Sequence, residues 1–346
     1  MKNADRQTRS YLMGLFAEQG IHPRGDLGQN FLVDLNLMEF IIRAAGLQPS
    51  DVVLEIGAGT GGMTSMMAPH VARVLSVEID PHMHAMASQA TEQFDNVTLL
   101  KTDALKNKNR LSPIVVEQLE EFLAEVPDPE FKLVANLPYS VATPVISNIV
   151  ASSLPWSTMI VTIQWELAQK MAATPEQSGY GALAIWLQSQ CRVKILKKLK
   201  PTVFWPRPKV DSAIVRLEPL QSAPWTIDDR RFFQDFVRRL FTQRRKLLRS
   251  VLASMYRKLL TKPQVDALLA GLGLKDDARA ENLDIPRMVT LSNAFQQAVG
   301  GAMESDEVST ETALADESDP ALETHVIDEG EVENDVPTDD DNDDEF

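Results

Sequence analysis

Short apolar segments alternate with amphipathic segments along the first two thirds of the chain. Apolar runs of five to nine residues predict buried strands, and apolar residues at helical spacing between them predict helices. The segment 51–70 is predicted to hold a strand, a glycine turn and a helix. Further strands are predicted at 73–80, 96–104, 131–139, 157–164, 191–199 and 210–220, and further helices at 81–94, 112–126, 143–152, 164–172 and 181–190. This alternation predicts an α/β fold with a doubly wound, mostly parallel sheet that is covered by helices on both faces.

The pattern changes near residues 219–226, because only helical spacing follows. We therefore predict a small all-helical domain after the α/β domain, in keeping with a chain of 346 residues that is long for a single core. The predicted organisation is an N-terminal extension at 1–21, an α/β domain at 22–220, a helical domain at 221–300 and an acidic tail at 301–346.

Charge is distributed unevenly along the chain. The formal net charge is −15, but residues 301–346 hold 19 Asp or Glu and no Lys or Arg, which leaves 30 acidic and 34 basic residues in 1–300. Dense like charge without an apolar period predicts a disordered tail. The tail either aids solubility or acts as a nucleic-acid mimic that competes for the basic surface of the body.

Composition excludes several classes of protein. The one cysteine, Cys191, rules out an internal disulfide framework and zinc sites built on paired cysteines, so we expect no metal. The first residues lack the apolar core of a signal peptide, and no apolar run approaches the ~20 residues that span a bilayer. We expect a cytoplasmic enzyme or binding protein, and a monomer.

A glycine-rich turn follows the first predicted strand. In "EIGAGTGG", Gly57, Gly59 and Gly61 permit positive φ and a close approach to a ligand. Glu78 and Asp103 end the next two strands, where carboxylates can accept from ribose hydroxyls and an adenine amine. The turn lacks the full dinucleotide fingerprint and a following Lys-Ser/Thr, which favours S-adenosylmethionine over a phosphorylated cofactor. The alternative is a tight turn that binds nothing.

The fourth strand runs into "NLPY". An adenine amine is a poor nucleophile, so a site that alkylates it needs oxygen acceptors around the nitrogen rather than a base. The Asn136 side chain and the carbonyl of Leu137 or Pro138 can supply these acceptors, and Tyr139 can stack on a base swung out of its strand. A turn with a surface tyrosine is the alternative.

Six segments, in order, resemble the KsgA-type small-subunit rRNA adenine dimethyltransferases, which are class I S-adenosylmethionine-dependent methyltransferases. The resemblance covers nearly all of 22–298. The segments are "LGQNFL", "VLEIGAGTGGMT", "ANLPYSVATPVI", "FWPRPKVDSAIVRL", "FTQRRKLLRSVL" and "ARAENLDIPRMVTLSNAF".

The resemblance implies a role for several individual residues. Tyr139 and Phe204 would hold the adenine between two rings, although Phe204 could instead fill the core. The reaction would transfer two methyl groups to each of two adjacent adenosines in the 3′-terminal hairpin loop of small-subunit (16S) rRNA, during assembly of the pre-30S particle. Contacts to S-adenosylmethionine are implied for Asn30, Leu32, Gly57, Glu78, Asp103 and Asn136, and the adenine site for Asn136, Leu137, Pro138 and Tyr139.

Basic residues cluster where an RNA substrate would need them, since phosphate contacts position a substrate without reading its sequence. The segment 105–131 is longer than expected for the family and is also basic, with no function assigned to it. The candidate RNA contacts are Lys209, Arg244, Arg245, Lys246 and Arg249, the last four expected on one helix.

Two other functions remain open. One is an Erm-type methyltransferase that modifies large-subunit rRNA with the same catalytic domain. The other is a non-catalytic RNA-binding assembly factor that retains the fold. The intact glycine turn, Glu78, Asp103 and the NLPY tetrad favour an enzyme, and "PKVDSAIVRL" and "ARAENL" favour the small-subunit substrate.

Overall fold

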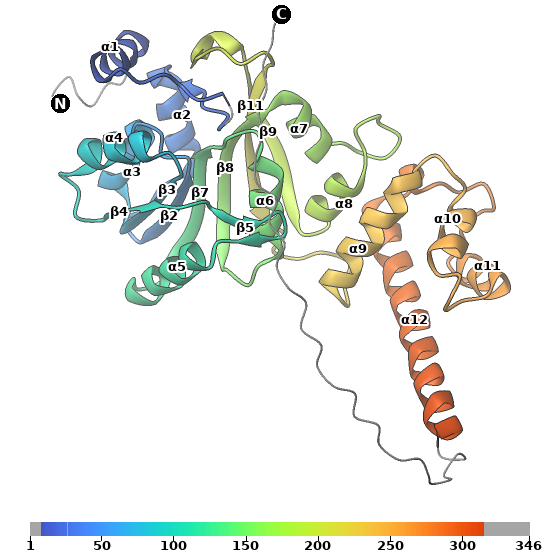
Figure 1. The fold of residues 1–346 in the computed structure, drawn as a ribbon. Coiled ribbons are helices and arrows are strands. Elements are labelled where there is room, and N and C mark those ends of the chain that lie inside the picture. The colour runs from blue at the N-terminus through green and yellow to red at the C-terminus, as the bar shows by residue number, and fades with distance from the viewer. Residues whose placement is uncertain (1–7, 26, 315–346) are drawn as a thin grey trace, which may run out of the picture. The chain divides into compact units, whose positions relative to one another are not determined.

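The structure is a computed structural model of the chain, and it describes residues 8–25 and 27–314. The described residues up to Ala302 belong to one compact unit, and those from Met303 onward belong to another. Figure 1 shows the order of the elements along the chain.

A sheet of seven strands forms the centre of the α/β part in the described residues, in the order β4-β3-β2-β7-β8-β11-β9. The first five strands run parallel, and β11 is antiparallel to both β8 and β9. Every residue of β2 is buried, as expected for a strand covered on both faces. The strands are β2 (Asp51–Ile56), β3 (Arg73–Glu78), β4 (Val97–Lys101), β7 (Glu130–Asn136), β8 (Trp156–Gln164), β9 (Cys191–Leu199) and β11 (Ser212–Pro219).

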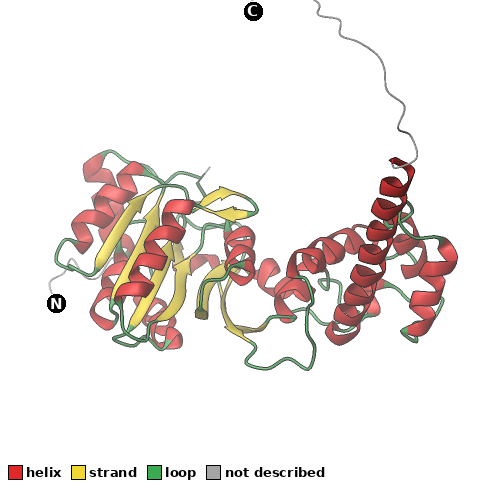
Figure 2. Ribbon diagram, turned by 90° about the horizontal axis from the view of Figure 1, so that it is seen from below, coloured by secondary structure: helices red, strands yellow, loops and turns green. Residues whose placement is uncertain are grey.

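Helices cover both faces of this sheet (Figure 2). Helices α2 and α3 bury their apolar side chains with one face of the strands, and α4 packs beside α3. Helices α5 to α8 share a larger core with the other face. Their bounds are α2 (Leu35–Ala45), α3 (Gly62–Met67), α4 (Pro81–Thr91), α5 (Pro113–Glu125), α6 (Ala142–Ala151), α7 (Trp165–Met171) and α8 (Ala182–Gln188), and the short 3-10 helices η2 (Ala68–His70) and η3 (Pro201–Val203) lie between elements.

The predicted strands and helices of the α/β part are confirmed, with shorter bounds at one edge. Strands β3, β4 and β7 end two or three residues before the predicted ends. The residues left over follow the carboxyl ends of the strands, and all of them except Asp80 line the cavity described below. A strand predicted from the apolar pattern extends too far there, because the loop residues that follow include apolar ones such as Ile79 and Leu137.

A helix that the pattern did not predict lies in the N-terminal extension. Helix α1 buries Leu12 and Phe16, and the Phe16 ring stands edge-on to Phe31 at 5.5 Å and to Trp205 at 5.0 Å between ring centroids. These partners come from two short paired strands, so three distant segments pack together. The bounds are α1 (Arg9–Gln19), β1 (Phe31–Leu32) and β10 (Phe204–Trp205).

The residues after β11 are helical, as predicted. The Tyr256 ring lies 6.4 Å from Phe236 and 5.4 Å from Phe295, and Tyr180 donates to the carbonyl of Leu283 at 2.7 Å. The apolar core therefore continues from the sheet into these helices. The domain boundary near 219–226 stays a prediction. The helices are α9 (Arg230–Leu240), η4 (Phe241–Gln243), α10 (Leu248–Met255), α11 (Lys262–Gly271), η5 (Ala280–Asn282) and α12 (Ile285–Leu314).

Helix α12 corrects the prediction for the start of the tail. It continues through Leu314, so residues 301–314 are helical rather than disordered. The alternation of apolar and polar residues in 285–300 carries on for a few turns before the acidic residues become dense. The remainder of the predicted tail, 315–346, lies outside the described residues. No helix in the described part of the chain is long and apolar enough to cross a membrane.

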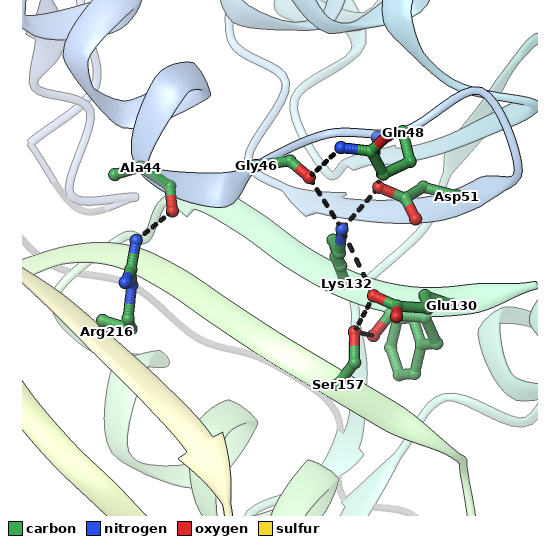
Figure 3. A network of polar contacts seen from close by, with 9 residues as sticks. Ala44, Gly46, Gln48, Asp51, Glu130, Lys132, Ser157 and Arg216 are labelled. Carbon is green, nitrogen blue, oxygen red and sulfur yellow. Dashed lines mark hydrogen bonds and ion pairs between the residues drawn. The ribbon is translucent and has the colours of Figure 1, made fainter.

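A buried polar network ties helix α2 to the amino ends of the strands (Figure 3). The Lys132 ammonium is 2.7 Å from the Asp51 carboxylate and donates to the carbonyl of Gly46 at 3.0 Å. Arg216 donates to the carbonyl of Ala44. Carbonyls in the last turn of a helix lack intrahelical partners, and cations there oppose the helix dipole. The network fixes the sheet at the end opposite the cavity.

Candidate active site

A cavity of about 250 Å³ lies at the carboxyl ends of the parallel strands. This is the edge of an open α/β sheet where ligands bind. Loops after β2, β3, β4 and β7 form it together with the segment before β1. Its lining is Leu27, Gly28, Gln29, Asn30, Phe31, Ile56, Gly57, Gly59, Val77, Glu78, Ile79, Thr102, Asp103, Ala104, Asn136, Leu137, Pro138, Tyr139, Ser140 and Val141.

The glycine turn brings two loops into contact. Gly57 has a φ of 84°, and a Cβ there would lie 3.2 Å from Cδ of Pro138. Gly59 has a φ of 55°, and its N–H donates to the Glu78 carboxylate at 2.8 Å. Because a side chain at Gly57 would push the NLPY loop (residues 136–139) away, the glycine is required by this contact as well as by its positive φ. The predicted positive φ of the turn is confirmed.

Glu78 is held by backbone amides on both oxygens. Gly59 donates to one oxygen, and the N–H of Asp80 donates to the other at 2.9 Å. Burial raises the pKa of Glu78, while these two hydrogen bonds oppose the rise. The side chain of the next residue, Ile79, is 48% exposed and lines the cavity. Sequence reasoning missed Ile79. An apolar residue between two acids at a strand end could have indicated a surface that packs on the adenine ring of a ligand.

Asp103 lies two residues beyond the end of β4 and is exposed. One of its oxygens accepts from the N–H of Leu105 at 2.9 Å, which holds the carboxylate at the cavity. Glu78 and Asp103 thus give the lining two carboxylates. Among the lining residues, all within the described part of the chain, none is Lys, Arg or His.

The groups that line the cavity fit S-adenosylmethionine. Carboxylates suit ribose hydroxyls, an adenine amine and a positively charged sulfonium, and Ile79 offers an apolar surface to the base. A phosphorylated cofactor would need cations or a cradle of amide N–H groups, as in phosphate-binding loops. Two backbone amides beside the glycine turn, those of Gly59 and Asp80, already donate to the Glu78 carboxylate.

Asn136 ends β7 and reaches the segment before β1. Its amide nitrogen donates to the carbonyl of Asn30 at 2.8 Å. This bond directs the amide group, because the nitrogen is used and the oxygen is left as an acceptor. Among the described residues, no donor to the Asn136 side-chain oxygen is present. Asn30 in turn donates from its own side chain to the carbonyl of Gly28 at 3.0 Å.

The NLPY loop has one backbone carbonyl that already accepts a hydrogen bond. The carbonyl of Pro138 accepts from the N–H of Val141 at 3.1 Å, which closes a turn. The carbonyl of Leu137 has no such partner in the described part of the chain, so it is the better of the two acceptors that the sequence left open. The Tyr139 hydroxyl lies 2.6 Å from Ser212 Oγ, and burial raises the pKa of Tyr139.

The structure does not bring two of the expected site residues to the cavity. Phe204 is 1% exposed and packs in the apolar core on the α2 face of the sheet, so its contact with the target base stays a prediction. Leu32 is 4% exposed in the same core and pairs with Phe204 across the β1–β10 ladder. The core-filling alternative describes Phe204 in this structure.

The candidate RNA contacts do not lie on one helix, which corrects that expectation. Arg244, Arg245 and Lys246 lie in the turn between η4 and α10, and Arg249 lies in the first turn of α10. Arg249 pairs with Asp266. Lys209, Arg245 and Lys246 are exposed. Arg244 donates to the carbonyl of Ser178 at 2.7 Å and lies 3.6 Å from Glu281.

Comparison with known proteins decides the family. The family model described as ribosomal RNA adenine dimethylase matches residues 21–297. The chain belongs to this family. The resemblance seen in the six motifs is thereby confirmed, and the enzyme class with it.

Curated members of the dimethylase family align over most of their length. Ribosomal RNA small subunit methyltransferase A of Lactobacillus johnsonii is 37% identical and covers 80% of this chain and 92% of its own. The protein of that name from Geobacillus kaustophilus is 35% identical, over 81% and 94%. The acidic tail lies beyond the aligned family region.

Solved structures share the fold. A dimethyladenosine transferase from Plasmodium falciparum superposes with a TM-score of 0.63 at 24% identity, covering 77% of this chain and 97% of that one. The 23S rRNA methyltransferase ErmE gives a TM-score of 0.55 at 24% identity, over 77% and 99%. The predicted class I methyltransferase fold is confirmed by these likenesses and by the strand order.

Proposed function

We propose that this dimethylase-family chain transfers methyl groups from S-adenosylmethionine to N6 of two adjacent adenosines in the 3′-terminal hairpin loop of small-subunit rRNA. The observation that carries the proposal is the Asn136 amide, whose nitrogen bonds Asn30 and whose oxygen is left at the rim of a cavity lined by two carboxylates. The curated relatives, at 35–37% identity, are small-subunit enzymes by name. The likeness to ErmE is one of fold.

The cofactor would be held by the groups around the cavity. Glu78 would accept from the ribose hydroxyls through its remaining lone pairs, Asp103 would accept from the adenine amine, and Ile79 would pack on the ring. S-adenosylmethionine, when bound, supplies a methyl group on a positively charged sulfur. None of the described lining residues is basic, so no side chain of the cavity would repel that positive charge.

The target adenine would be held by the NLPY loop. The Asn136 side-chain oxygen and the Leu137 carbonyl would accept the two amine hydrogens, which draws the nitrogen lone pair out of the ring. Tyr139 would stack on the extruded base. Positive charge develops on the nitrogen during the reaction, and the two fixed oxygens would stabilise it before the proton is lost to solvent. No side chain needs to act as a base.

The reaction can be tested by primer extension on unmodified small-subunit and large-subunit particles, since dimethylated adenines block reverse transcription. We expect stops at the two adjacent adenosines with S-adenosylmethionine and none without it. Stops in large-subunit rRNA instead would favour the Erm-type alternative. No stops, with binding of small-subunit rRNA retained, would favour the assembly factor. Since the particle assembles in the cytoplasm, the proposal includes that location.

Cofactor binding has a separate test. A ligand that binds only the native state raises the melting temperature by mass action. We expect S-adenosylmethionine to raise it and NAD to leave it unchanged. A chain that NAD stabilises and S-adenosylmethionine does not would contradict the assignment of the cavity.

A further inference from the structure

A second depression lies next to the cavity and belongs to none of the sites assigned so far. It is a groove of about 1340 Å³ between a hairpin, helix α6 and helix α9. The hairpin consists of β5 (Leu105–Asn107) and β6 (Arg110–Leu111). Ser140 lines both the cavity and the groove, so the groove begins at the edge of the NLPY loop.

The walls of the groove are basic. One acidic side chain, Asp235, and six basic ones are among the described residues that line it. The basic residues are Lys106, Lys108 and Arg110 on the hairpin and Arg230, Arg231 and Arg238 on α9. Asp235 pairs with Arg238 at 2.5 Å, which leaves the groove strongly positive.

The hairpin charges are uncompensated. Lys106, Lys108 and Arg110 are exposed, and none of them makes an ion pair with another described residue. Some other exposed cations among the described residues do have a carboxylate partner, as Lys170 has Glu166 and Lys198 has Asp211. Three unpaired cations on a turn of a few residues repel one another. Such a cluster is stabilised when a polyanion binds it.

The hairpin holds these charges in place. Leu111 is 8% exposed and belongs to the main apolar core, so it anchors β6. The turn is closed by the N–H of Asn109, which donates to the Asn107 side chain at 2.9 Å. At the tip, Asn148 of α6 donates to the carbonyl of Lys108 at 3.4 Å. The cations therefore project from an anchored element rather than from a free loop.

The floor of the groove carries small polar side chains. Thr143, Ser147 and Asn148 of α6 line it, next to Ser140. Hydroxyls and amides between rows of Lys and Arg are the groups that contact the phosphates and sugars of a nucleic-acid backbone. An apolar peptide would find little surface here, and an acidic protein would not need the continuity with the NLPY loop that Ser140 provides.

We propose that this groove binds the sugar-phosphate backbone of the RNA strand that leads to the target adenine, with Lys106, Lys108 and Arg110 as its contacts from the hairpin. The inference rests on the proposed function and adds a contact surface to it. It also gives the long segment after β4 a purpose, since the hairpin places positive charge across from α9.

The test measures RNA binding as a function of salt. The triple variant Lys106→Gln, Lys108→Gln and Arg110→Gln is compared with Arg257→Gln, Lys258→Gln and Lys262→Gln. The control removes the same charge from exposed residues that do not line the groove. The probe is an unmodified transcript of the 3′-terminal hairpin of small-subunit rRNA with its flanking strands.

We expect the hairpin variant to lower the slope of log affinity against log salt by about 2, since each single-strand phosphate contact contributes ~0.7. This corresponds to a loss of affinity of up to about 100-fold at 0.1 M salt. The control triple should stay within a few-fold of the wild type. Equal slopes and affinities for the two triples would overturn the proposal.

Two further measurements keep the outcomes distinct. The rise in melting temperature with S-adenosylmethionine should be the same in both triples, which shows that the fold and the cavity are intact. If the wild type methylates rRNA and the two triples bind alike, the groove inference fails and the proposed function stands. If the wild type neither binds nor methylates rRNA, the proposed function fails.

The position of the strand can be mapped directly. Cys191 is buried and burial raises its pKa to about 12, so it resists labelling and a cysteine introduced at the hairpin tip can be modified selectively. A photo-crosslinker on Asn109→Cys should react with nucleotides flanking the target loop. Crosslinks confined to distant nucleotides, with the target loop still methylated, would contradict the assigned path.

Discussion

The hydroxyl of Tyr139 lies 2.6 Å from Ser212 Oγ, and this bond joins a loop to a strand. Ser212 is fully buried at the start of β11, where it pairs with Gln164 on one side and Leu199 on the other. Tyr139 belongs to the NLPY loop and is only partly buried. The sheet therefore fixes the orientation of the ring that would stack on the adenine, and Ser212 is a positioning residue.

We expect Tyr139→Phe and Ser212→Ala each to lower kcat by two- to ten-fold, because a single hydrogen bond contributes ~0.5–1.5 kcal/mol. The KM for S-adenosylmethionine should not change. The double variant should be no worse than either single one, since both remove the same bond. Additive losses would show that Ser212 acts elsewhere. Tyr139→Ala, which also removes the ring, should lose much more activity.

Asn136→Ala should abolish detectable methylation, with a loss of at least about 10²-fold as for other preorganised oxygen or N–H groups. Cofactor affinity should weaken only moderately, because Glu78 and Asp103 remain. Asn136→Asp is a sharper variant, since it keeps an oxygen but loses the N–H that bonds Asn30. We expect it to be inactive as well. Methylation assays and S-adenosylmethionine thermal shifts on both variants check this. Wild-type turnover in either one would refute the role of the directed amide.

Glu55 should make the free energy of unfolding depend on pH. Burial raises the pKa of Glu55 to about 7, although Ser76 and Thr64 donate to it at 2.6 and 2.5 Å and oppose the rise. The folded state then keeps a proton that the unfolded state loses near pH 4.5. Stability from this group is therefore greatest at low pH and falls as the pH rises to about 7, by up to ~3 kcal/mol.

Urea denaturation of the wild type and Glu55→Gln between pH 5 and 8 measures this effect. The wild type should lose stability relative to the variant as the pH rises, because glutamine does not titrate. Glu78 also titrates in the folded state, but it is present in both proteins and cancels in the difference. Parallel profiles would mean that Glu55 is ionised throughout.

Lys132→Met should destabilise the fold by ~3–5 kcal/mol, since it leaves the buried Asp51 carboxylate without the cation that pairs with it (Figure 3). The double variant Lys132→Met with Asp51→Asn should recover part of the loss. The matched control is Lys170→Met, which removes an exposed ion pair with Glu166 and should cost under ~1 kcal/mol. Urea denaturation of the three variants checks the order. A Lys132→Met loss no greater than that of the control would show that the network contributes little.

Truncation after Leu314 should tighten RNA binding at low salt. It removes 15 acidic and no basic residues, which takes the formal net charge from −15 to 0. The melting temperature should not change, because the described core ends earlier in the chain. The gain in affinity should vanish above about 0.5 M salt as charges are screened. Unchanged affinity at low salt would contradict the idea that the tail competes with RNA.

Much of the site could be predicted because its residues follow buried strands directly. Glu78, Asp103 and Asn136 were placed at neighbouring strand ends from the apolar pattern alone, and the cavity brings them together. Phe204 shows where this reasoning stops. Neighbouring residues of a strand face opposite sides, so one of Phe204 and Trp205 had to be buried in the core on the α2 face of the sheet. The register of β10 on β1 decides which one, and it depends on a segment about 170 residues away.

Helix α1 and the hairpin were missed for related reasons. Helix α1 contains Gly14 and shows little amphipathic pattern, and the aromatic residues that hold it lie in other segments. The hairpin has few apolar residues and a strand of only two residues. In both, contacts with distant parts of the chain outweigh local preference.

The hydrogen bond from Asn136 to the carbonyl of Asn30 spans 106 positions of sequence. Engineers who wish to transplant the NLPY tetrad into another methyltransferase scaffold must therefore carry the LGQNFL segment with it. A graft of the tetrad alone would leave the carboxamide free to rotate and to present its N–H₂ group, which is a donor, to an amine whose hydrogens need acceptors.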